Sequence, residues 1–489
     1  MTEIEVIVGG NYGSEGKGHL CAQRVLDATQ NHQPVYNVRV GGPNAGHTAV
    51  TRDGTPVAFR HVPVGALYPE QDDIHLMLAA GSEIDLQVLQ DELQRLHQMF
   101  GNPTRVYVDK NATVLEPRHI EQEQKSSLNA QTGSTVKGVG AARADRIWRT
   151  AQTISQYADQ DQNQDQINTL ENLGLRITDV TQILQQLTTG EPVNARIVIE
   201  GTQGYELGLH TEHYPQTTSN DCRAIDFLSQ TGISPWATNT QTTVWIAARV
   251  YPIRVAGNSG QMSGGETNWE QLGLPPEHTT VTKKTRRVGY FDPQQLEQAL
   301  IGNGASLHGR NTNVRLALTM VDQIDPQIAG ATDPRDLRTE PLTQWLLQLG
   351  PIARQHLSAM TTSDRTIAYL GSYTQDPLPL DEDITDWWET EGHLRDWWER
   401  QAQAEIEQYA PKAAEYGQQS LQQLGETLNQ AGIEGDPIEL AIWVYTVGKL
   451  TRWNAATSQG TPVSDDTLHD IATYVKMVQY RRHTTGDTK

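Results

Sequence analysis

The chain of 489 residues carries 38 Lys and Arg against 59 Asp and Glu, a formal net charge of −21 at pH 7. This acidic balance excludes a general affinity for nucleic acid or anionic membranes, because phosphate groups attract a surplus of Lys and Arg. Two cysteines, Cys21 and Cys222, exclude a disulfide framework and a Cys-based zinc site. Since no apolar run reaches the roughly 18 residues of a membrane span, we expect a globular, cytoplasmic protein.

The first predicted element is a buried β-strand over 4–10 that runs into a glycine-rich turn, and a helix follows over 19–30. Further apolar strands are expected at 35–42, 74–81, 105–110, 195–201, 243–255 and 314–322. The polar stretch 156–170 is expected to be a surface helix or loop. Strands separated by helices or long loops predict an α/β fold with a mostly parallel central sheet, whose strand ends carry the chemistry.

The composition of the chain changes after residue 373. The residues that follow are rich in Pro and Asp, and the apolar pattern typical of β-strands ends there. We therefore predict a first domain over 1–375, a linker over 376–395 and an all-α domain over 396–489.

The loop "NYGSEGKGHL" at 11–20 resembles a phosphate-binding loop but fails the strict Walker pattern. Five residues separate Gly10 from Gly16, and Gly18 follows Lys17 where Ser or Thr is required. Glycines at this spacing still let successive backbone amides point at an anion at a helix N-terminus, with Lys17 as a positive charge.

Five further segments occur in a fixed order: "GGPNAGHT" at 41–48, "GSTVKGVGAARADRIWR" at 133–149, "EGTQGYELGLHTEHYPQTTSN" at 200–220, "TVTKKTRRVGYFD" at 280–292 and "LTMVDQID" at 318–325. Together with the loop they resemble the adenylosuccinate synthetase family over about residues 4–325. The resemblance implies that family's fold and a two-step ligase reaction. A nucleoside triphosphate phosphorylates the 6-oxygen of a purine monophosphate, and L-aspartate then displaces the phosphate.

The resemblance also implies roles for individual residues. The catalytic group comprises Ser14, Lys17, His47 and Gln203. The substrate nucleotide is expected to bind at Ser14, Asn44, Ser134, Thr135, Arg149, Gln203 and Thr218. The donor is expected at Gly13, Glu15, Gly16, Lys17, Gly18, Gly46, Thr48 and Asp322, with Mg²⁺ held near Gly46 and Ser14. Family members insert the arginine that matches Arg149 from the neighbouring subunit, which implies a homodimer.

The aspartate pocket is expected at Thr282, Lys284 and Arg286, because cationic side chains suit two carboxylates. Arg286 and Arg287 offer the bidentate fork. The glycine-rich segment 256–267 matches a family loop that closes over aspartate. Lys284 replaces the family's arginine, which favours a deoxyribose.

Ser14 departs from the family pattern, in which an aspartate takes the purine N1 proton and helps to bind magnesium. A serine hydroxyl is no base at neutral pH. The same replacement is associated with the PurZ-like branch, which acts on dGMP and supplies 2-aminoadenine for DNA. We therefore expect dGMP, with two alternatives: a synthetase that acts on IMP, and a catalytically silent nucleotide-binding paralogue. Because Met320 replaces the family's guanine-packing lysine beside Asp322, ATP or GTP remains open as the donor.

The tail resembles phage nucleotide-modification domains and, more distantly, MazG-type pyrophosphohydrolases. Glu415, Glu439, Asp466 and Asp470 recur on its predicted helices and are candidate Mg²⁺ ligands, since the cation prefers oxygen. This resemblance implies cleavage of dGTP to dGMP. The alternative is that these acids form the solvated faces of a dimerising bundle.

Overall fold

The computed structural model describes residues 1–370 except 72, 192, 279–283, 307–310 and 312, and residues 418–458 except 432, 434 and 435. The chain divides into two units, Met1–Tyr373 and Thr374–Lys489. The expected linker 376–395 lies outside the described residues, so that boundary stays a prediction.

A ten-stranded sheet forms the centre of the first unit. Its strands follow the order β17 (Ile367–Tyr369), β16 (Leu357–Thr361), β15 (Val314–Thr319), β11 (Thr240–Arg249), β1 (Thr2–Gly9), β10 (Arg196–Glu200), β2 (Val35–Arg39), β5 (Ile74–Leu78), β7 (Val106–Asp109) and β9 (Leu175–Thr178). Every pair of neighbours is parallel except β16 and β17. The expected α/β class is therefore confirmed.

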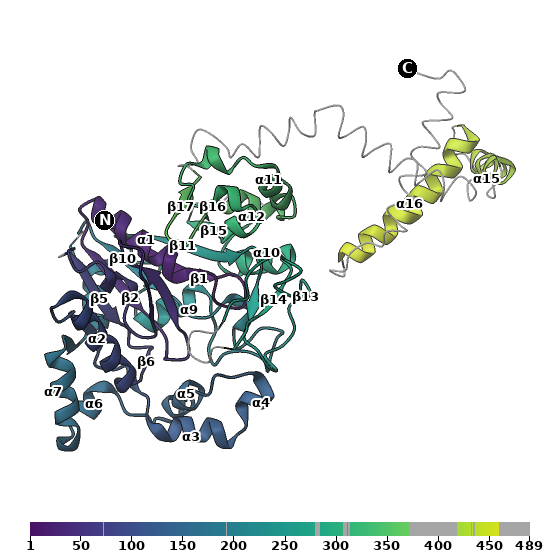
Figure 1. Ribbon diagram of the computed structural model, residues 1–489. Helices are drawn as coiled ribbons and strands as arrows, with labels where there is room; N and C mark the ends of the chain where they lie inside the picture. The colour runs from purple at the N-terminus through teal and green to yellow at the C-terminus, as the bar shows by residue number, and fades with distance from the viewer. Residues whose placement is uncertain are drawn as a thin grey trace. The chain divides into compact units, whose positions relative to one another are not determined.

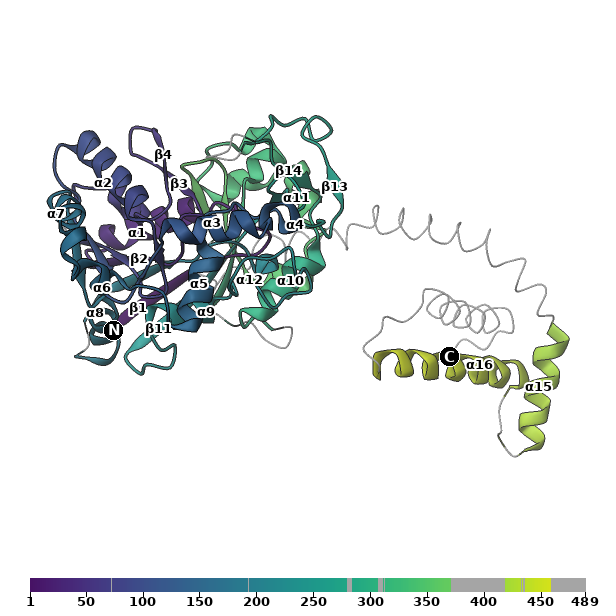
Figure 2. The same cartoon turned by 90° about the horizontal axis from the view of Figure 1, so that it is seen from below.

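Helices cover both faces of this sheet. They are α1 (Lys17–Gln30), α2 (Leu86–Phe100), α3 (Pro117–Lys125), α4 (Leu128–Thr132), α5 (Val139–Trp148), α6 (Ile154–Ala158), α7 (Gln164–Asn172), α8 (Val180–Thr189), α9 (Ala224–Thr231), α10 (Pro293–Gly302), α11 (Glu340–Leu346) and α12 (Pro351–His356). Seen from below, α1 and α2 lie on one face, and α8 and α9 on the other (Figure 2). Figure 1 shows α3, α4 and α5 gathered beyond the main sheet.

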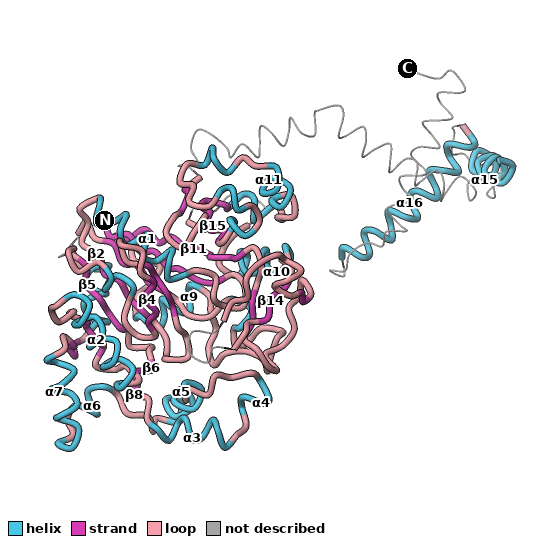
Figure 3. The backbone as a smooth tube through the Cα atoms, in the orientation of Figure 1, coloured by secondary structure: helices cyan, strands magenta, loops and turns pink. Residues whose placement is uncertain are grey.

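Three small sheets complete the unit. They pair β12 (Ile253–Arg254), β14 (Arg287–Gly289) and β13 (Glu266–Thr267), then β3 (His47–Val50) with β4 (Pro56–Phe59), and β6 (Glu83–Ile84) with β8 (Thr113–Val114). Short 3₁₀ turns occupy η1 (Val64–Leu67), η2 (Asp161–Asn163), η3 (Tyr205–Leu207), η4 (Val321–Gln323), η5 (Pro326–Ile328) and η6 (Pro334–Leu337). Figure 3, with loops in pink, shows how irregular the chain is around β14.

One strand prediction needs correction, and several strands were missed. The single strand expected over 243–255 divides into β11 and β12, which belong to different sheets, because Pro252 between them has no amide to donate to a strand neighbour. Strands β9, β16 and β17 were not predicted at all. The polar stretch 156–170 forms the end of α6, the turn η2 and most of α7, with Ile167 and Leu170 buried, as expected for a surface helix.

The core lies between α1 and α2 and the central strands. β1 is almost wholly buried, and Leu20, Val25 and Ala28 of α1 are fully buried. Helix α2 shows how local sequence sets its limits. The Asp85 carboxylate accepts hydrogen bonds from the amides of Gln87 and Val88, and Gly101 ends the helix in the left-handed conformation.

In the second unit the structure describes two helices, α15 (Gln418–Gln430) and α16 (Pro437–Ser458), which pack against each other. The described part of the tail is thus helical, as expected. Among the helices that the structure describes, none has the length and apolarity that crossing a membrane requires.

Candidate functional site

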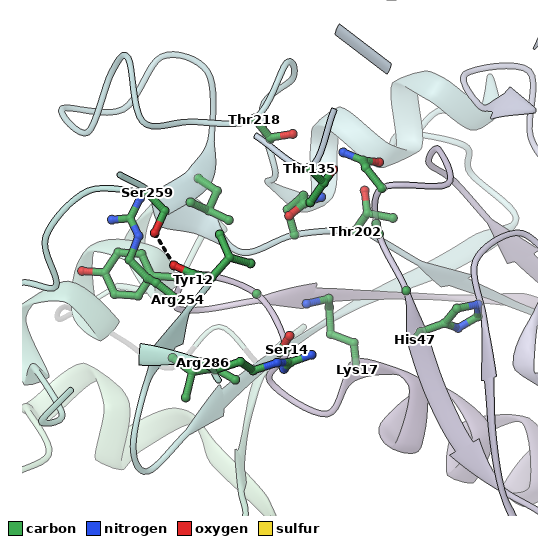
Figure 4. Close-up of a pocket in the computed structure, with 18 of the residues that line it drawn as sticks. Tyr12, Ser14, Lys17, His47, Thr135, Thr202, Thr218, Arg254, Ser259 and Arg286 are labelled. Atoms are coloured by element: carbon green, nitrogen blue, oxygen red, sulfur yellow. Dashed lines mark hydrogen bonds between the residues drawn. The ribbon is translucent and has the colours of Figure 1, made fainter. Parts of the chain in front are cut away.

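A cavity of about 980 Å³ opens at the carboxyl ends of the central strands. Parallel strands bring their carboxyl ends to one edge, which is where α/β sheets bind ligands. Most residues expected at the site line this cavity: Gly13, Ser14, Gly16, Lys17, Gly18, Asn44, Gly46, His47, Thr48, Ser134, Thr135, Gln203, Thr218, Lys284, Arg286 and Asp322. In the view of Figure 4, Ser14 lies between Arg286 and Lys17, with Thr135 and Thr218 across the cavity.

The loop between β1 and α1 turns sharply through left-handed residues. Gly13 and Gly16 have φ of 93° and 75°, and the non-glycine Ser14 has φ of 58°. Ser14 is exposed to the cavity, while Lys17 begins α1 and is buried. The helix N-terminus and Lys17 therefore present positive charge to the cavity, as an anion-binding loop requires.

Glu15 is not among the residues that line the cavity, so its expected contact with the donor stays a prediction. Its carboxylate is fully buried beneath the loop, where it accepts the amides of Asn11 and Gly13 at 3.1 and 2.6 Å. Its other oxygen lies 2.5 Å from the ammonium group of Lys17. The Glu15 carboxylate therefore shapes the loop and positions Lys17.

Gly18 allows helix α1 to approach the strand that carries His47. A Cβ at residue 18 would lie 2.7 Å from the carbonyl oxygen of Thr48 and 3.4 Å from the Cβ of His47. His47 is the first residue of β3 and is buried at the cavity wall. Burial, aided by the charge of Arg39, lowers the pKa of His47 against the opposing influence of Glu200.

The expected purine side of the cavity is built on the segment that follows β10. Gln203 adopts φ of 63°, and a Cβ at Gly13 would lie 3.7 Å from the Cα of Gln203, so this segment touches the loop after β1. Arg254, from β12, lines the same cavity and its guanidinium lies 4.5 Å from the ring centroid of Tyr12. Burial lowers the pKa of Arg254 to about 10. Neither Arg254 nor Tyr12 was predicted from the sequence.

Three charged side chains meet beside Ser14 on the expected aspartate side. Arg249 is fully buried, lies 2.5 Å from Glu277 and donates to the Ser14 carbonyl at 3.4 Å. Glu277 lies 4.0 Å from Arg286. Burial would raise the pKa of Glu277, but the Arg249 guanidinium outweighs it and holds that pKa below its ordinary value. Arg286 is half-buried, so it can present a concentrated positive charge to a carboxylate.

One expectation for the aspartate pocket is untested, and one differs from the structure. Thr282 lies outside the described residues. Arg287 does not offer a fork to the cavity, because it pairs with Glu266 and donates to Ser259 and Gly260 at 3.0 and 2.8 Å. Arg287 thereby fastens the glycine-rich segment 256–267 to β14.

The expected donor side is formed after β15 and β16. Asp322 lies in η4 at the cavity wall, and burial raises the pKa of its carboxyl group. Met320 has φ of 63° and donates its amide to the Thr361 hydroxyl at 2.8 Å. His19 lines the same cavity, and burial lowers its pKa. The expected donor side is therefore lined by Met320, His19 and two carboxylates, Asp322 and Asp364.

Arg149 stands apart from the cavity of its own chain. It follows the C-terminus of α5 with φ of 63° and is exposed, beside Ile147 and Trp148, whose exposed fractions are 72% and 76%. Its expected role in a neighbouring subunit stays a prediction.

In the tail, Glu439 lies in the first turn of α16, whereas Glu415, Asp466 and Asp470 are outside the described residues. Within the described ranges, three or more His, Cys, Asp or Glu side chains nowhere gather in a metal-binding arrangement. The MazG-like reading of the tail stays a prediction.

Two further charged residues at the cavity were not predicted, Arg39 and Glu200. Each is the last residue of a buried strand. A charged side chain at the end of an apolar run is the sequence pattern that could have identified both residues. Burial would raise the pKa of Glu200, yet Arg39 and His47 lower it to about 2.

The adenylosuccinate synthetase family model matches residues 6–174 and 157–325. The adenylosuccinate synthetase of Methanococcus aeolicus is 33% identical over 340 residues, which cover 69% of this chain and 90% of that protein. The Thermococcus onnurineus synthetase is 34% identical over 331 residues, 67% of this chain and 86% of its own.

Two solved structures share the fold. One is the cyanophage S-2L succinoaminodeoxyadenylate synthetase, PurZ, bound to dGMP and to dATP as an energy donor. It has a TM-score of 0.57 and 26% sequence identity, and the match covers 76% of this chain and 96% of the cyanophage chain. The other, the fully ligated Plasmodium falciparum adenylosuccinate synthetase, has a TM-score of 0.57 and 19% identity over 75% of this chain and 99% of its own, which supports the fold alone. On these matches the chain belongs to the adenylosuccinate synthetase family, whose members are C–N ligases that join aspartate to a purine nucleotide.

Proposed function

We propose that this ligase joins L-aspartate to C6 of dGMP through a 6-phosphoryl intermediate, with ATP or GTP as donor, and produces N6-succino-2-amino-2′-deoxyadenylate. Ser14 carries the proposal, because it faces the cavity where ordinary synthetases are expected to have aspartate. Guanine has an exocyclic amine at C2, next to N1, and needs room there. A serine hydroxyl is smaller than a carboxylate and still accepts a hydrogen bond.

A carboxylate at residue 14 would pair with both N1–H and N2–H of guanine and hold the unreactive lactam form. The likeness to the cyanophage enzyme solved with dGMP supports the same substrate. The archaeal relatives are adenylosuccinate synthetases, so IMP is the competing substrate.

The residues of the cavity fit the two steps of the reaction. In the first step the γ-phosphoryl group moves to O6, the donor departs as the nucleoside diphosphate, and the N1 proton passes to solvent. Lys17 with the loop amides stabilises the phosphate charge. His47 stabilises the charge at O6. In the second step the aspartate amine attacks C6 and phosphate departs, while Arg286 and Lys284 hold the aspartate carboxylates.

Mg²⁺ fits this site as an ion bound mainly by its substrates. Ser14, in the loop after β1, and Gly46, in the segment before β3, both line the cavity and would supply a hydroxyl and a carbonyl oxygen as ligands. Because Mg²⁺ prefers six oxygen ligands and keeps several waters, phosphate oxygens and water would complete its shell. When bound, the ion neutralises phosphate charge.

We also propose that the enzyme acts as a homodimer with Arg149 reaching the partner's cavity. The exposed Ile147 and Trp148 beside it support this, because large apolar side chains so exposed favour a contact surface.

The direct test incubates the purified protein with aspartate, Mg²⁺ and ATP, dATP or GTP, against dGMP, GMP and IMP, and detects succinylated product by mass spectrometry. We expect product from dGMP. Product from IMP alone would overturn the proposal.

A matched pair of variants tests the role of residue 14. Ser14→Asp should raise kcat/KM for IMP by about 10² or more, because a positioned general base contributes about 10² to 10⁴. It should lower kcat/KM for dGMP, because the larger carboxylate takes the room of the C2 amine and holds the lactam form. Ser14→Ala should keep the preference for dGMP over IMP, since it leaves the same space. If Ser14→Asp did not change the ratio of dGMP to IMP activity, residue 14 would not select the purine.

A further inference from the structure

We propose that Glu200 is a positioning residue for the ligase reaction, holding the imidazole of His47 through Nδ1 while Arg39 holds the carboxylate in place. The proposal rests on the proposed function only in taking His47 as part of the reacting site, and it holds for either purine substrate.

The sheet places Arg39 and Glu200 side by side. They are the last residues of the neighbouring parallel strands β2 and β10 and lie opposite each other in register. Residues opposite each other in register point to the same face of a sheet. The Nη1 of Arg39 lies 2.8 Å from Oε1 of Glu200, and the two side chains are only 2% and 1% exposed.

The second carboxylate oxygen of Glu200 is directed to His47. Nδ1 of His47 lies 2.9 Å from Oε2 of Glu200. Among the described residues neither ring nitrogen of His47 has a partner in full hydrogen-bond geometry, so the contact at Nδ1 is a close ion-pair approach to Glu200, while Nε2 is buried. A partner on one ring nitrogen fixes the tautomer and the plane of an imidazole. Glu200 therefore orients the ring and leaves Nε2 available to the substrate.

Arg39 also fixes the chain that carries His47. Its Nη2 donates to the carbonyl oxygen of Ala45 at 2.7 Å, two residues before His47. One guanidinium thus holds both the carboxylate that orients the imidazole and the backbone that leads to it. This double attachment explains why a buried arginine stands at the end of β2.

The charges around Glu200 keep its carboxylate ionised, as the contact with His47 requires. A buried carboxylate without a partner would take up a proton and lose its hold on Nδ1. Arg39 and His47 instead stabilise the charged form, so Glu200 is ionised at neutral pH.

The test compares Glu200→Gln with the unaltered protein on whichever purine nucleotide the unaltered protein uses. Glutamine has one acceptor oxygen, so it cannot accept from both Arg39 and His47. We expect kcat to fall about 10- to 100-fold, the range for residues that orient a functional histidine, with little change in KM for the nucleotide or aspartate. Glu200→Asp, which keeps the charge, should recover part of the rate.

Glu5→Gln is the matched control. Glu5 is a buried carboxylate on β1 that lies 2.6 Å from Arg24 and does not line the cavity. This change should leave kcat unaltered. An equal loss of kcat in Glu5→Gln and Glu200→Gln would assign the effect to lost stability and overturn the proposal.

Two readouts separate positioning from a general structural role. In a His47→Ala background, Glu200→Gln should lower kcat little further, because residues that act as a unit are not additive. If the losses of kcat caused by His47→Ala and by Glu200→Gln multiplied in the double variant, the two residues would act independently and the proposal would be contradicted. Without any turnover, nuclear magnetic resonance of ¹⁵N-histidine protein should show the His47 signal with the proton on Nδ1, assigned by its absence in His47→Ala. A proton on Nε2 that is unaffected by Glu200→Gln would equally overturn it.

Discussion

Replacing Gly18 by alanine tests whether the first turn of α1 sets the position of His47. In an ordinary helix this change stabilises by about 0.5–1 kcal/mol. Here the new Cβ would meet the Thr48 carbonyl oxygen at 2.7 Å, so α1 or β3 must move by roughly half an ångström to restore normal contact. Overpacking of this kind costs about 1–3 kcal/mol, so we expect a net loss of about 1 kcal/mol.

The loss of activity should exceed what that stability change explains. A shift of β3 displaces His47, and misplacement of a reacting group by about 1 Å can cost about 10² in rate. We expect kcat to fall at least about tenfold while urea denaturation shows a well-folded protein. The control is Gly448→Ala in α16, where a Cβ meets nothing within 4 Å and kcat should stay unchanged. A Gly18→Ala protein as active and as stable as the original would refute the reasoning.

Three further predictions concern His61, Glu15 and Met320. Burial lowers the pKa of His61 to about 3. As the pH falls, the imidazole of His61 therefore takes up its proton in the unfolded chain before it does so in the folded protein. The free energy of unfolding decreases for this reason between about pH 6.5 and 3. At pH 5 the loss is about 2 kcal/mol, and His61→Gln, which keeps an acceptor for the Asp85 amide, should remove this part of the pH dependence in urea titrations. Glu15→Gln should destabilise by about 3–5 kcal/mol because it leaves the buried Lys17 charge without its partner, whereas an unchanged urea midpoint would contradict that pairing. Met320→Lys should raise kcat/KM for GTP relative to ATP if a lysine packing on guanine selects the donor, and equal ratios would remove residue 320 from donor choice.

The sequence was sufficient for the central strands of the sheet and for most of the cavity, because strands with continuous apolar runs and ordered motifs leave a strong local signal. β1, β2, β5, β7, β10 and β15 were all predicted within a few residues. β9, β16 and β17 were missed, since short strands of mixed polarity depend on their neighbours in the sheet for recognition.

The polar partners beneath the site could not be predicted in the same way. Glu15 lies within the recognised loop, yet only the folded turn shows that its carboxylate points inward. Glu200 and Arg39 are 161 residues apart and meet only through strand register. From the sequence, Arg287 and Arg286 were equally good candidates for binding a carboxylate of aspartate. In the structure Arg287 pairs with Glu266, across strands β13 and β14, and only Arg286 lines the cavity.

The left-handed turn at Ser14 has a consequence for how such enzymes diverge. At φ of 58° most side chains are strained, and aspartate and asparagine are among the residues that tolerate this conformation best. The backbone therefore suits aspartate at least as well as serine, and an exchange at this residue leaves the turn in place. The exchange that we propose to select the purine therefore needs no rebuilding of the loop, and its cost in stability is small.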